Sequence, residues 1–146
     1  MISHQRFLPA PDAIRMALVE WRHRMEAVGI APAMVARAEL VLAEVCNNID
    51  KHGCAGLSGG WIVLNTRMSG DGLHLTVLDN GTAPPAHLLD PVLVAPAPLQ
   101  GLPLTAIPEG GYGWFLIRQL ARDITMDQSL GCNRLRLRVP PGDDDG

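Results

Sequence analysis

Residues 134–139 alternate strictly between arginine and an aliphatic residue, and this pattern restricts the fold more than any other stretch. Leu135, Leu137 and Val139 share one side of a strand, and three arginines share the other. One dry face and one wet face are typical of an antiparallel sheet covered on one side only. The arginine row could also contact a phosphate backbone. The net charge of −3 and the lack of interleaved aromatic residues favour a solvated face.

Length and composition are compatible with a single domain. The chain has 146 residues, of which 47% are hydrophobic. We predict one domain over residues 1–141 and a disordered acidic tail over residues 142–146. The negative charge argues against a dedicated nucleic-acid binder, since such proteins carry an excess of basic residues. No apolar run has the length of a signal peptide or of a membrane span.

The three cysteines favour a reducing compartment. Cys46, Cys54 and Cys132 are an odd number, and no pair has the spacing of metal ligands. We therefore expect reduced thiols in a cytoplasmic protein.

Two helices are predicted from apolar residues at spacings of three and four. The first begins at Pro11 and ends at Gly29, and the second begins at Pro32 and ends near residues 51–53. The apolar stripe of the first helix contains Ile14, Leu18, Trp21, Met25 and Val28. The stripe of the second contains Met34, Val35, Ala38, Val41, Leu42, Val45 and Ile49.

The opposite side of the first helix is basic. It carries Arg15, Arg22, His23 and Arg24. Such a row is usually a solvated face, and this is the preferred interpretation. The alternative is a docking surface for an acidic partner.

Five strands are predicted around these helices. Residues 61–68 and 73–79 form a hairpin across a Gly-containing turn, after a Gly/Ser-rich loop at residues 54–60. A short edge strand is predicted at residues 3–8. The last two strands are predicted at residues 123–128 and 132–139.

Residues 82–108 differ from the rest of the chain. They hold seven of the twelve prolines, and no lysine or arginine occurs between Arg67 and Arg118. Loops of this length are usually functional lids or linkers. We interpret the segment as a lid over a pocket or as a structural crossover. A third helix then begins at the glycines of residues 110–113 and continues to Ala121.

The predicted order of elements is therefore β-α-α-β-β-lid-α-β-β. This order predicts an α+β fold, a two-layer α/β sandwich with a mixed, mainly antiparallel sheet and helices on one face.

Three short motifs carry the candidate chemistry, and the first lies on the second helix. Glu44 and Asn48 are one helical turn apart, about 40° from each other around the axis, and border the apolar stripe. A carboxylate and an amide in this position suit the floor of a pocket. Asn48 offers a neutral oxygen acceptable to Mg²⁺, and Glu44 could act as a general base on an attacking hydroxyl.

The second motif ends a strand and the third begins a helix. Asp79 continues the buried row of its strand and could accept a hydrogen bond from the exocyclic amine of adenine. Gly81 allows close approach of the backbone to the base. Gly111 and Gly113 stand at a helix start, where free N–H groups favour phosphate. The chain has no P-loop sequence. Together the motifs predict one pocket for ATP.

In this order, the motifs resemble the N-box (E-x-x-x-N), the G1 box (D-x-G) and the G2 box (G-x-G) of the Bergerat-fold, or GHKL, ATPases. This superfamily includes DNA gyrase B subunits and sensor histidine kinases. The resemblance covers roughly residues 3–139. The two leading helices, the short chain and the sequence of residues 111–117 look most like the bacterial anti-sigma-factor serine kinases.

The resemblance implies a role for each matching residue. Glu44 matches the catalytic glutamate, and Asn48 matches the asparagine that binds Mg²⁺. Asp79 and Gly81 match the adenine site. Gly111 and Gly113 match the glycines that bind phosphate. The implied protein binds a sigma factor, keeps it from RNA polymerase, and phosphorylates a serine of a small antagonist protein. It is typically a homodimer.

The sequence departs from the family pattern at three places. Ala83 stands where a second glycine often follows D-x-G, and Tyr112 stands where relatives often have arginine. The lid has no lysine or arginine to meet a γ-phosphate. Lys51, His52 or a residue of a partner would have to supply that charge. Two alternatives therefore stay open: a non-catalytic binding module that sequesters a partner, and a detached sensor histidine kinase domain.

Overall fold

The computed structural model describes residues 1–83 and 111–142. Its elements follow the predicted order, with one added π-helical turn, η1, after the second helix. The predicted lid falls almost wholly outside the described residues, as does the tail from residue 143 onward. The elements are β1 (Ser3–Phe7), α1 (Pro11–Ala27), α2 (Pro32–Asn48), η1 (Ile49–Gly53), β2 (Ile62–Ser69), β3 (Gly72–Asp79), α4 (Gly111–Leu120), β4 (Arg122–Ser129) and β5 (Cys132–Val139).

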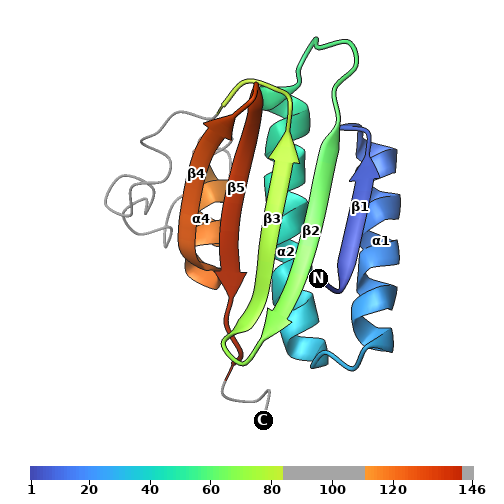
Figure 1. Ribbon diagram of the computed structural model, residues 1–146, viewed down its shortest axis with the longest axis vertical. Helices are drawn as coiled ribbons and strands as arrows, with labels where there is room; N and C mark the ends of the chain where they lie inside the picture. Colours follow the sequence, from blue (N-terminus) through green and yellow to red (C-terminus); the bar gives the residue numbers. More distant parts are fainter. Residues whose placement is uncertain (84–110, 143–146) are drawn as a thin grey trace, which may run out of the picture.

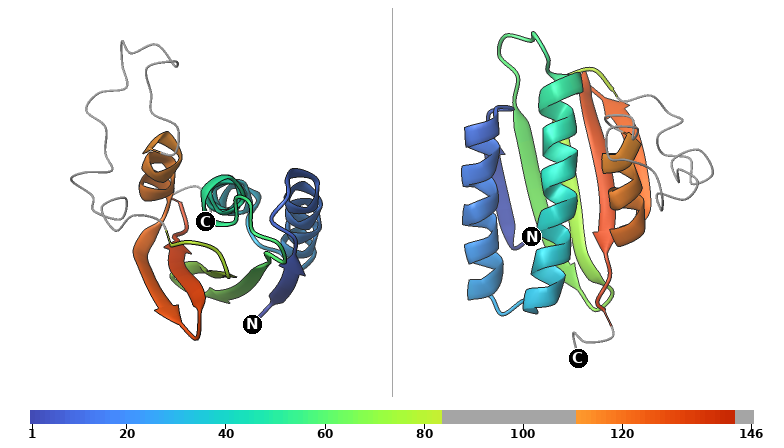
Figure 2. Two further views of the ribbon diagram at one scale, coloured as in Figure 1. Left: turned by 90° about the horizontal axis from the view of Figure 1, so that it is seen from above. Right: turned by 180° about the vertical axis from the view of Figure 1, so that it is seen from behind.

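The strands form one five-stranded sheet in the order β1-β2-β3-β5-β4. Every pairing of neighbours in this sheet is antiparallel. The three α-helices lie on one face of it, with α2 in the middle and α1 and α4 on either side (Figures 1 and 2). The predicted two-layer α+β fold is confirmed, except that the described sheet is antiparallel throughout and not mixed. β5 enters the sheet between β3 and β4, and so the last strand of the chain lies beside the end of the hairpin.

The core lies between α2 and the inner face of the sheet. Trp21 of α1 is fully buried, and its Nε1 donates a hydrogen bond to Oγ1 of Thr66 on β2, at 3.0 Å. In the described residues, no helix has the length and apolar character needed to cross a membrane. The buried residues of α2 are Met34, Val35, Ala38, Val41, Leu42, Val45 and Cys46.

Val28 is the exposed residue of the apolar stripe predicted for α1, and Ile49 of the second stripe is only partly buried. Val28 is 53% exposed, because α1 ends at Ala27 and Val28 leaves the helical path. Gly29 follows with φ +85°, a left-handed conformation that turns the chain. Ile30, at 8% exposure, occupies the core beyond that turn.

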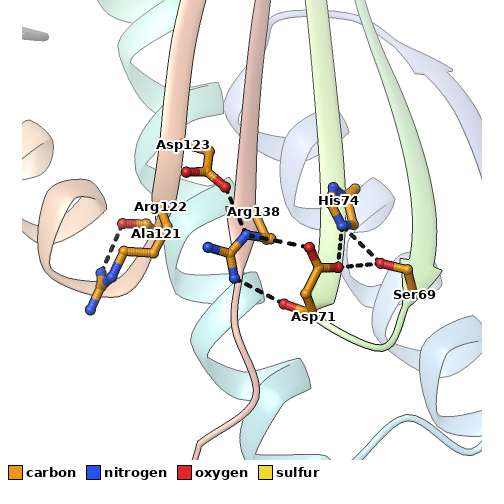
Figure 3. Close-up of polar contacts among 7 residues, drawn as sticks. All are labelled: Ser69, Asp71, His74, Ala121, Arg122, Asp123 and Arg138. Atoms are coloured by element: carbon orange, nitrogen blue, oxygen red, sulfur yellow. Dashed lines mark hydrogen bonds and ion pairs between the residues drawn. The ribbon is translucent and has the colours of Figure 1, made fainter.

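The bare face of the sheet carries the predicted arginine row, and the aspartates of the same chain neutralise it. Arg134 and Arg136 both contact Asp127, at 2.9 and 3.2 Å. Arg138 Nε donates to Asp123 at 2.9 Å, and its Nη1 donates to the Asp71 carbonyl at 3.0 Å (Figure 3). A solvated, self-paired face therefore explains the alternation of residues 134–139.

The turn of the β2–β3 hairpin is part of the same network. The Ser69 hydroxyl and the His74 ring both contact the Asp71 carboxylate, the ring at 2.7 Å (Figure 3). The Ser69 hydroxyl, followed by the His74 ring, lowers the pKa of Asp71 to about 2. The hairpin turn is thereby attached to β5 through Arg138.

Candidate functional site

The start of α4 lies directly against the Glu44/Asn48 pair of α2. A Cβ added to Gly113 would lie 2.7 Å from Glu44 Oε2 and 3.6 Å from Asn48 Nδ2. A side chain at position 113 would therefore displace the Glu44 carboxylate, whereas glycine leaves it in place against the first turn of α4. Gly111 is the first residue of α4, and Gly113 follows in the same first turn. The structure thus brings together two of the three sequence motifs.

The Asn48 amide has an unused hydrogen-bonding atom. Its Nδ2 is buried and has no hydrogen-bond partner within the described ranges. Amide nitrogen and oxygen exchange places when the group rotates by 180°, so either atom can take this position. An unsatisfied buried polar atom costs about 1–3 kcal/mol, which favours an incoming partner at this point.

The donor set at this position fits Mg²⁺. No group of three or more His, Cys, Asp or Glu side chains in residues 1–83 and 111–142 is arranged to hold a metal ion. Mg²⁺ does not require one, because it is commonly held by one or two protein oxygens together with phosphate oxygens and waters. Asn48 would supply the amide oxygen, with the Glu44 carboxylate beside it.

Asp79 ends β3 on the inner face of the sheet and is 4% exposed. Its Oδ1 accepts two hydrogen bonds, from the Gly81 backbone N at 2.8 Å and from Asn133 Nδ2 at 3.0 Å. Burial raises the pKa of Asp79, and these two hydrogen bonds oppose the rise. In the described part of the chain, Oδ2 has no recorded hydrogen bond, and so it can accept one from a ligand.

η1 connects the Asn48 end of the site with Asp79. The Thr82 backbone N donates to the Gly53 carbonyl at 2.7 Å. A Cβ on Gly81 would lie 2.3 Å from that same carbonyl oxygen, and one on Gly53 would lie 3.9 Å from Asp79 Oδ1. The segment after β3 therefore packs tightly on the turn that ends α2, and Gly81 is required for the contact.

Two cysteines, Cys46 on α2 and Cys54 after η1, lie near Asp79. Burial raises the pKa of Cys46 to about 12, and the nearby Asp79 carboxylate adds to the effect. The pKa of Cys54 is raised by burial and then by Asp79 and Asp50. All three cysteines are free, and the raised pKa values make Cys46 and Cys54 unreactive thiols.

Asn133 is a site residue that the sequence reasoning missed. It is 1% exposed, and its Nδ2 donates to both Asp79 Oδ1 and the Gly81 carbonyl, the latter at 2.8 Å. Gln128 Nε2 donates to Asn133 Oδ1 at 2.9 Å, which fixes the orientation of the amide. Asn133 therefore clamps the D-x-G turn. A signal was present: alternation in β5 places Asn133 on the same face as the buried Leu135.

The positions that depart from the family pattern lie at the edges of this arrangement. Ala83 is the last residue described before the gap, and Tyr112 lies in the first turn of α4. Lys51 and His52 lie on η1 and are exposed. η1 begins at the residue after Asn48, so both side chains lie at the end of α2 that carries Asn48.

Comparison with known families gives one match. The family model described as "Histidine kinase-like ATPase domain" matches residues 7–139, which include every site residue named above. No curated protein matches the chain.

Proposed function

Since this chain belongs to the family of histidine kinase-like ATPase domains, we propose that it binds ATP and phosphorylates a serine of a partner protein. The family supports ATP binding and chemistry of the ATPase or kinase type. The observation that carries the proposal is the packing of Gly113 on Glu44 and Asn48. It places a helix start, a carboxylate and an amide around one point.

Asp79 and Gly81 form the proposed adenine end of the site. Oδ1 of Asp79 is held by two donors, so Oδ2 accepts the exocyclic amine of adenine. Asn133 keeps the carboxylate in place and also binds the Gly81 carbonyl. The missing Cβ of Gly81 is needed for the contact with the Gly53 carbonyl, which fixes the turn that follows Asp79.

Gly111, Gly113 and Asn48 form the proposed phosphate end. The first N–H groups of a helix lack partners within the helix, and its dipole favours negative charge there. A bound Mg²⁺ would neutralise phosphate charge in the transition state. Asn48 would hold it through its amide oxygen.

Glu44 is the proposed general base. Its Oε2 lies next to Gly113, at the start of the phosphate-binding helix. A carboxylate in this position accepts the proton of a serine hydroxyl as that oxygen attacks the γ-phosphate. In phosphoryl transfer the protein contributes mainly positioning and charge stabilisation, for which these few groups suffice.

We further propose the biological setting that the resemblance implies. The partner is a small antagonist protein that carries the serine, and the chain also binds a sigma factor as a cytoplasmic homodimer. The sequence of residues 111–117 and the two leading helices support this setting. The absence of lysine and arginine between Arg67 and Arg118 favours the second candidate, a nucleotide-binding module that acts by sequestration alone.

Phosphate transfer separates these functions. The chain is incubated with γ-labelled ATP, Mg²⁺ and a candidate antagonist, and the labelled product is treated with acid. We expect an acid-stable phosphoserine on the antagonist. An acid-labile product would identify a histidine kinase instead. Tight ATP binding with no transfer to any antagonist that the chain binds would identify the sequestering module.

Substitution of Gly113 tests the geometry of the site. In Gly113→Ala the new Cβ pushes on the Glu44 carboxylate, which is the mobile end of a side chain, so the fold should survive. We expect ATP affinity and transfer each to fall by about tenfold or more, because a misplacement of about 1 Å can cost 10²-fold. Gly70→Ala is the control, since a Cβ there meets nothing within 4 Å. Equal loss in both variants, measured by calorimetric titration and label transfer, would contradict the proposed contact.

A further inference from the structure

We propose that the free edge of β1, with the exposed side of α1, binds an extended segment of a partner protein in which acidic and apolar residues alternate. This surface is separate from the nucleotide site, and the inference does not depend on the proposed kinase activity. It rests on an open strand edge, a groove, and a charge opposite to that of the whole chain.

The edge is the first observation. β1 is the outermost strand, and within the described residues it pairs on one side only, with β2. An edge strand presents N–H and C=O groups that can pair with a further strand. Figure 1 shows β1 at the margin of the sheet beside α1.

The groove is the second observation. A hollow of about 920 Å³ runs between residues 4–8 of β1 and its following loop and the outer side of α1. Its apolar wall includes Leu8, Met16 and Val19, which are 63, 70 and 37% exposed. Side chains of this kind on a helix next to a free strand edge favour an occupant with apolar residues on the helix side.

Charge is the third observation. The groove is lined by two arginines, Arg6 and Arg15, against one acidic residue, Glu20, and the histidines His4 and His23 add no formal charge at pH 7. Glu20 lies 3.8 Å from Arg24 in a pair that is 45 and 65% exposed. The pair of Arg15 with Asp12 is 75 and 87% exposed, and such pairs are weak. A basic groove on a chain of net charge −3 complements an acidic segment.

The alternation of side chains along β1 determines which residues of the bound strand should be apolar and which should be acidic. Burial alternates along β1, with Gln5 and Phe7 turned toward the helices and His4 and Arg6 exposed. A sixth strand would continue both faces. Its residues on the helix side would meet Met16 and Val19, and its residues on the bare side would meet His4 and Arg6. The matching sequence therefore alternates between apolar and acidic residues.

A second copy of this chain fits the edge less well. Two copies could pair their β1 strands antiparallel about a twofold axis. If the helices of both copies are to lie on the same face of the joined sheet, the axis must pass beside one residue of β1, which then faces the same residue of the other copy. Centred on Gln5, the pairing sets His4 against Arg6 of the other copy and gives that arginine no acidic partner, and centred on Arg6, it sets two like charges, arginine against arginine, opposite each other. Like charges directly opposite in a sheet are destabilising. A heterologous acidic strand avoids this repulsion.

The test uses a fluorescein-labelled peptide of alternating valine and glutamate, roughly eight residues long. We expect saturable binding to the full chain by fluorescence anisotropy. Met16→Lys and Arg6→Glu should each weaken binding by about tenfold or more, whereas Leu40→Lys, an exposed apolar residue of α2, should not. Arg6 stacks on Trp61 at 5.3 Å, so circular dichroism checks the fold of that variant.

Three controls can overturn the proposal. A peptide with N-methylated alternate amides must lose binding, because retained binding would mean charge attraction without strand addition. A valine–lysine peptide must prefer the His4→Glu/Arg6→Glu variant over the unchanged chain. If the valine–glutamate peptide fails to bind and Met16→Lys dissociates a dimer in sedimentation, the edge belongs to a second copy.

Discussion

Glu44→Gln should abolish phosphate transfer and leave ATP binding nearly intact. Glutamine has the size of glutamate and can keep the contact with Gly113, but it cannot accept the proton of an attacking hydroxyl. General-base catalysis typically contributes about 10²–10⁴-fold, and we expect a loss in this range. Single-turnover transfer of labelled phosphate to the antagonist measures the rate, and calorimetric titration measures the affinity.

Glu39→Gln is the matched control for this variant. Glu39 lies on the same helix, but its carboxylate pairs with Arg22 of α1 at 3.1 Å, away from the start of α4. Its substitution should leave the transfer rate unchanged. A Glu44→Gln protein that still transfers phosphate at the normal rate would eliminate Glu44 as the base.

Asp79→Asn should cause the largest loss of ATP affinity, about 100-fold. An asparagine can still accept the hydrogen bonds from Gly81 and Asn133 through Oδ1, but it places an NH₂ group where Oδ2 was. That donor would face the donor amine of adenine. Loss of a hydrogen bond to a charged group costs about 1.5–3 kcal/mol, or about 10–100-fold in affinity, and the repulsion adds to it.

The same variant should be at least as stable as the unchanged chain at neutral pH. Because burial raises the pKa of Asp79, the unfolded chain loses this proton at lower pH than the folded chain. The contribution of Asp79 to stability therefore falls as pH rises through the folded pKa, and the cost is complete above it. The advantage of the asparagine variant should shrink as pH is lowered through that range.

Thermal unfolding and titration with Mg-ATP on the same samples separate the two effects. Asp12→Asn serves as the control, since Asp12 is 87% exposed on α1 and its surface pair with Arg15 is weak. Lost affinity in a protein of unchanged or higher melting temperature supports a carboxylate kept for ligand binding. Equal affinity in Asp79→Asn would remove Asp79 from the site.

The elements of the fold could be predicted because their signals are local. Period 3.6 in α1 and α2, and period 2 in β3 and β5, depend only on residues a few positions apart. The predicted end near residues 51–53 matches the end of η1, but the change from α-helix to π-helix after Asn48 could not be placed this way. A π-type bond, from the Cys54 backbone N to the Ile49 carbonyl at 2.7 Å, closes η1. It forms where the segment after β3 packs on Gly53.

The site was predicted in its motifs but not in its closure. Glu44, Asn48 and Asp79 were proposed as site residues from their places on a helix and a strand, and these roles stay predictions. The role of Asn133 follows from β5 lying between β3 and β4, and no local pattern gives the order of strands. Its partner Asp79 lies directly opposite in the register, 54 residues away along the chain.

The clamp of Asp79 by Asn133 has a consequence for the life of the chain during synthesis. A ribosome that has made α2 and the hairpin has already produced the carboxylate, yet only the Gly81 backbone N holds it until β5 emerges and Asn133 adds the second hydrogen bond. ATP binding can therefore stabilise only the complete domain. Fragments that end before residue 133 should not bind ATP at any concentration found in the cell.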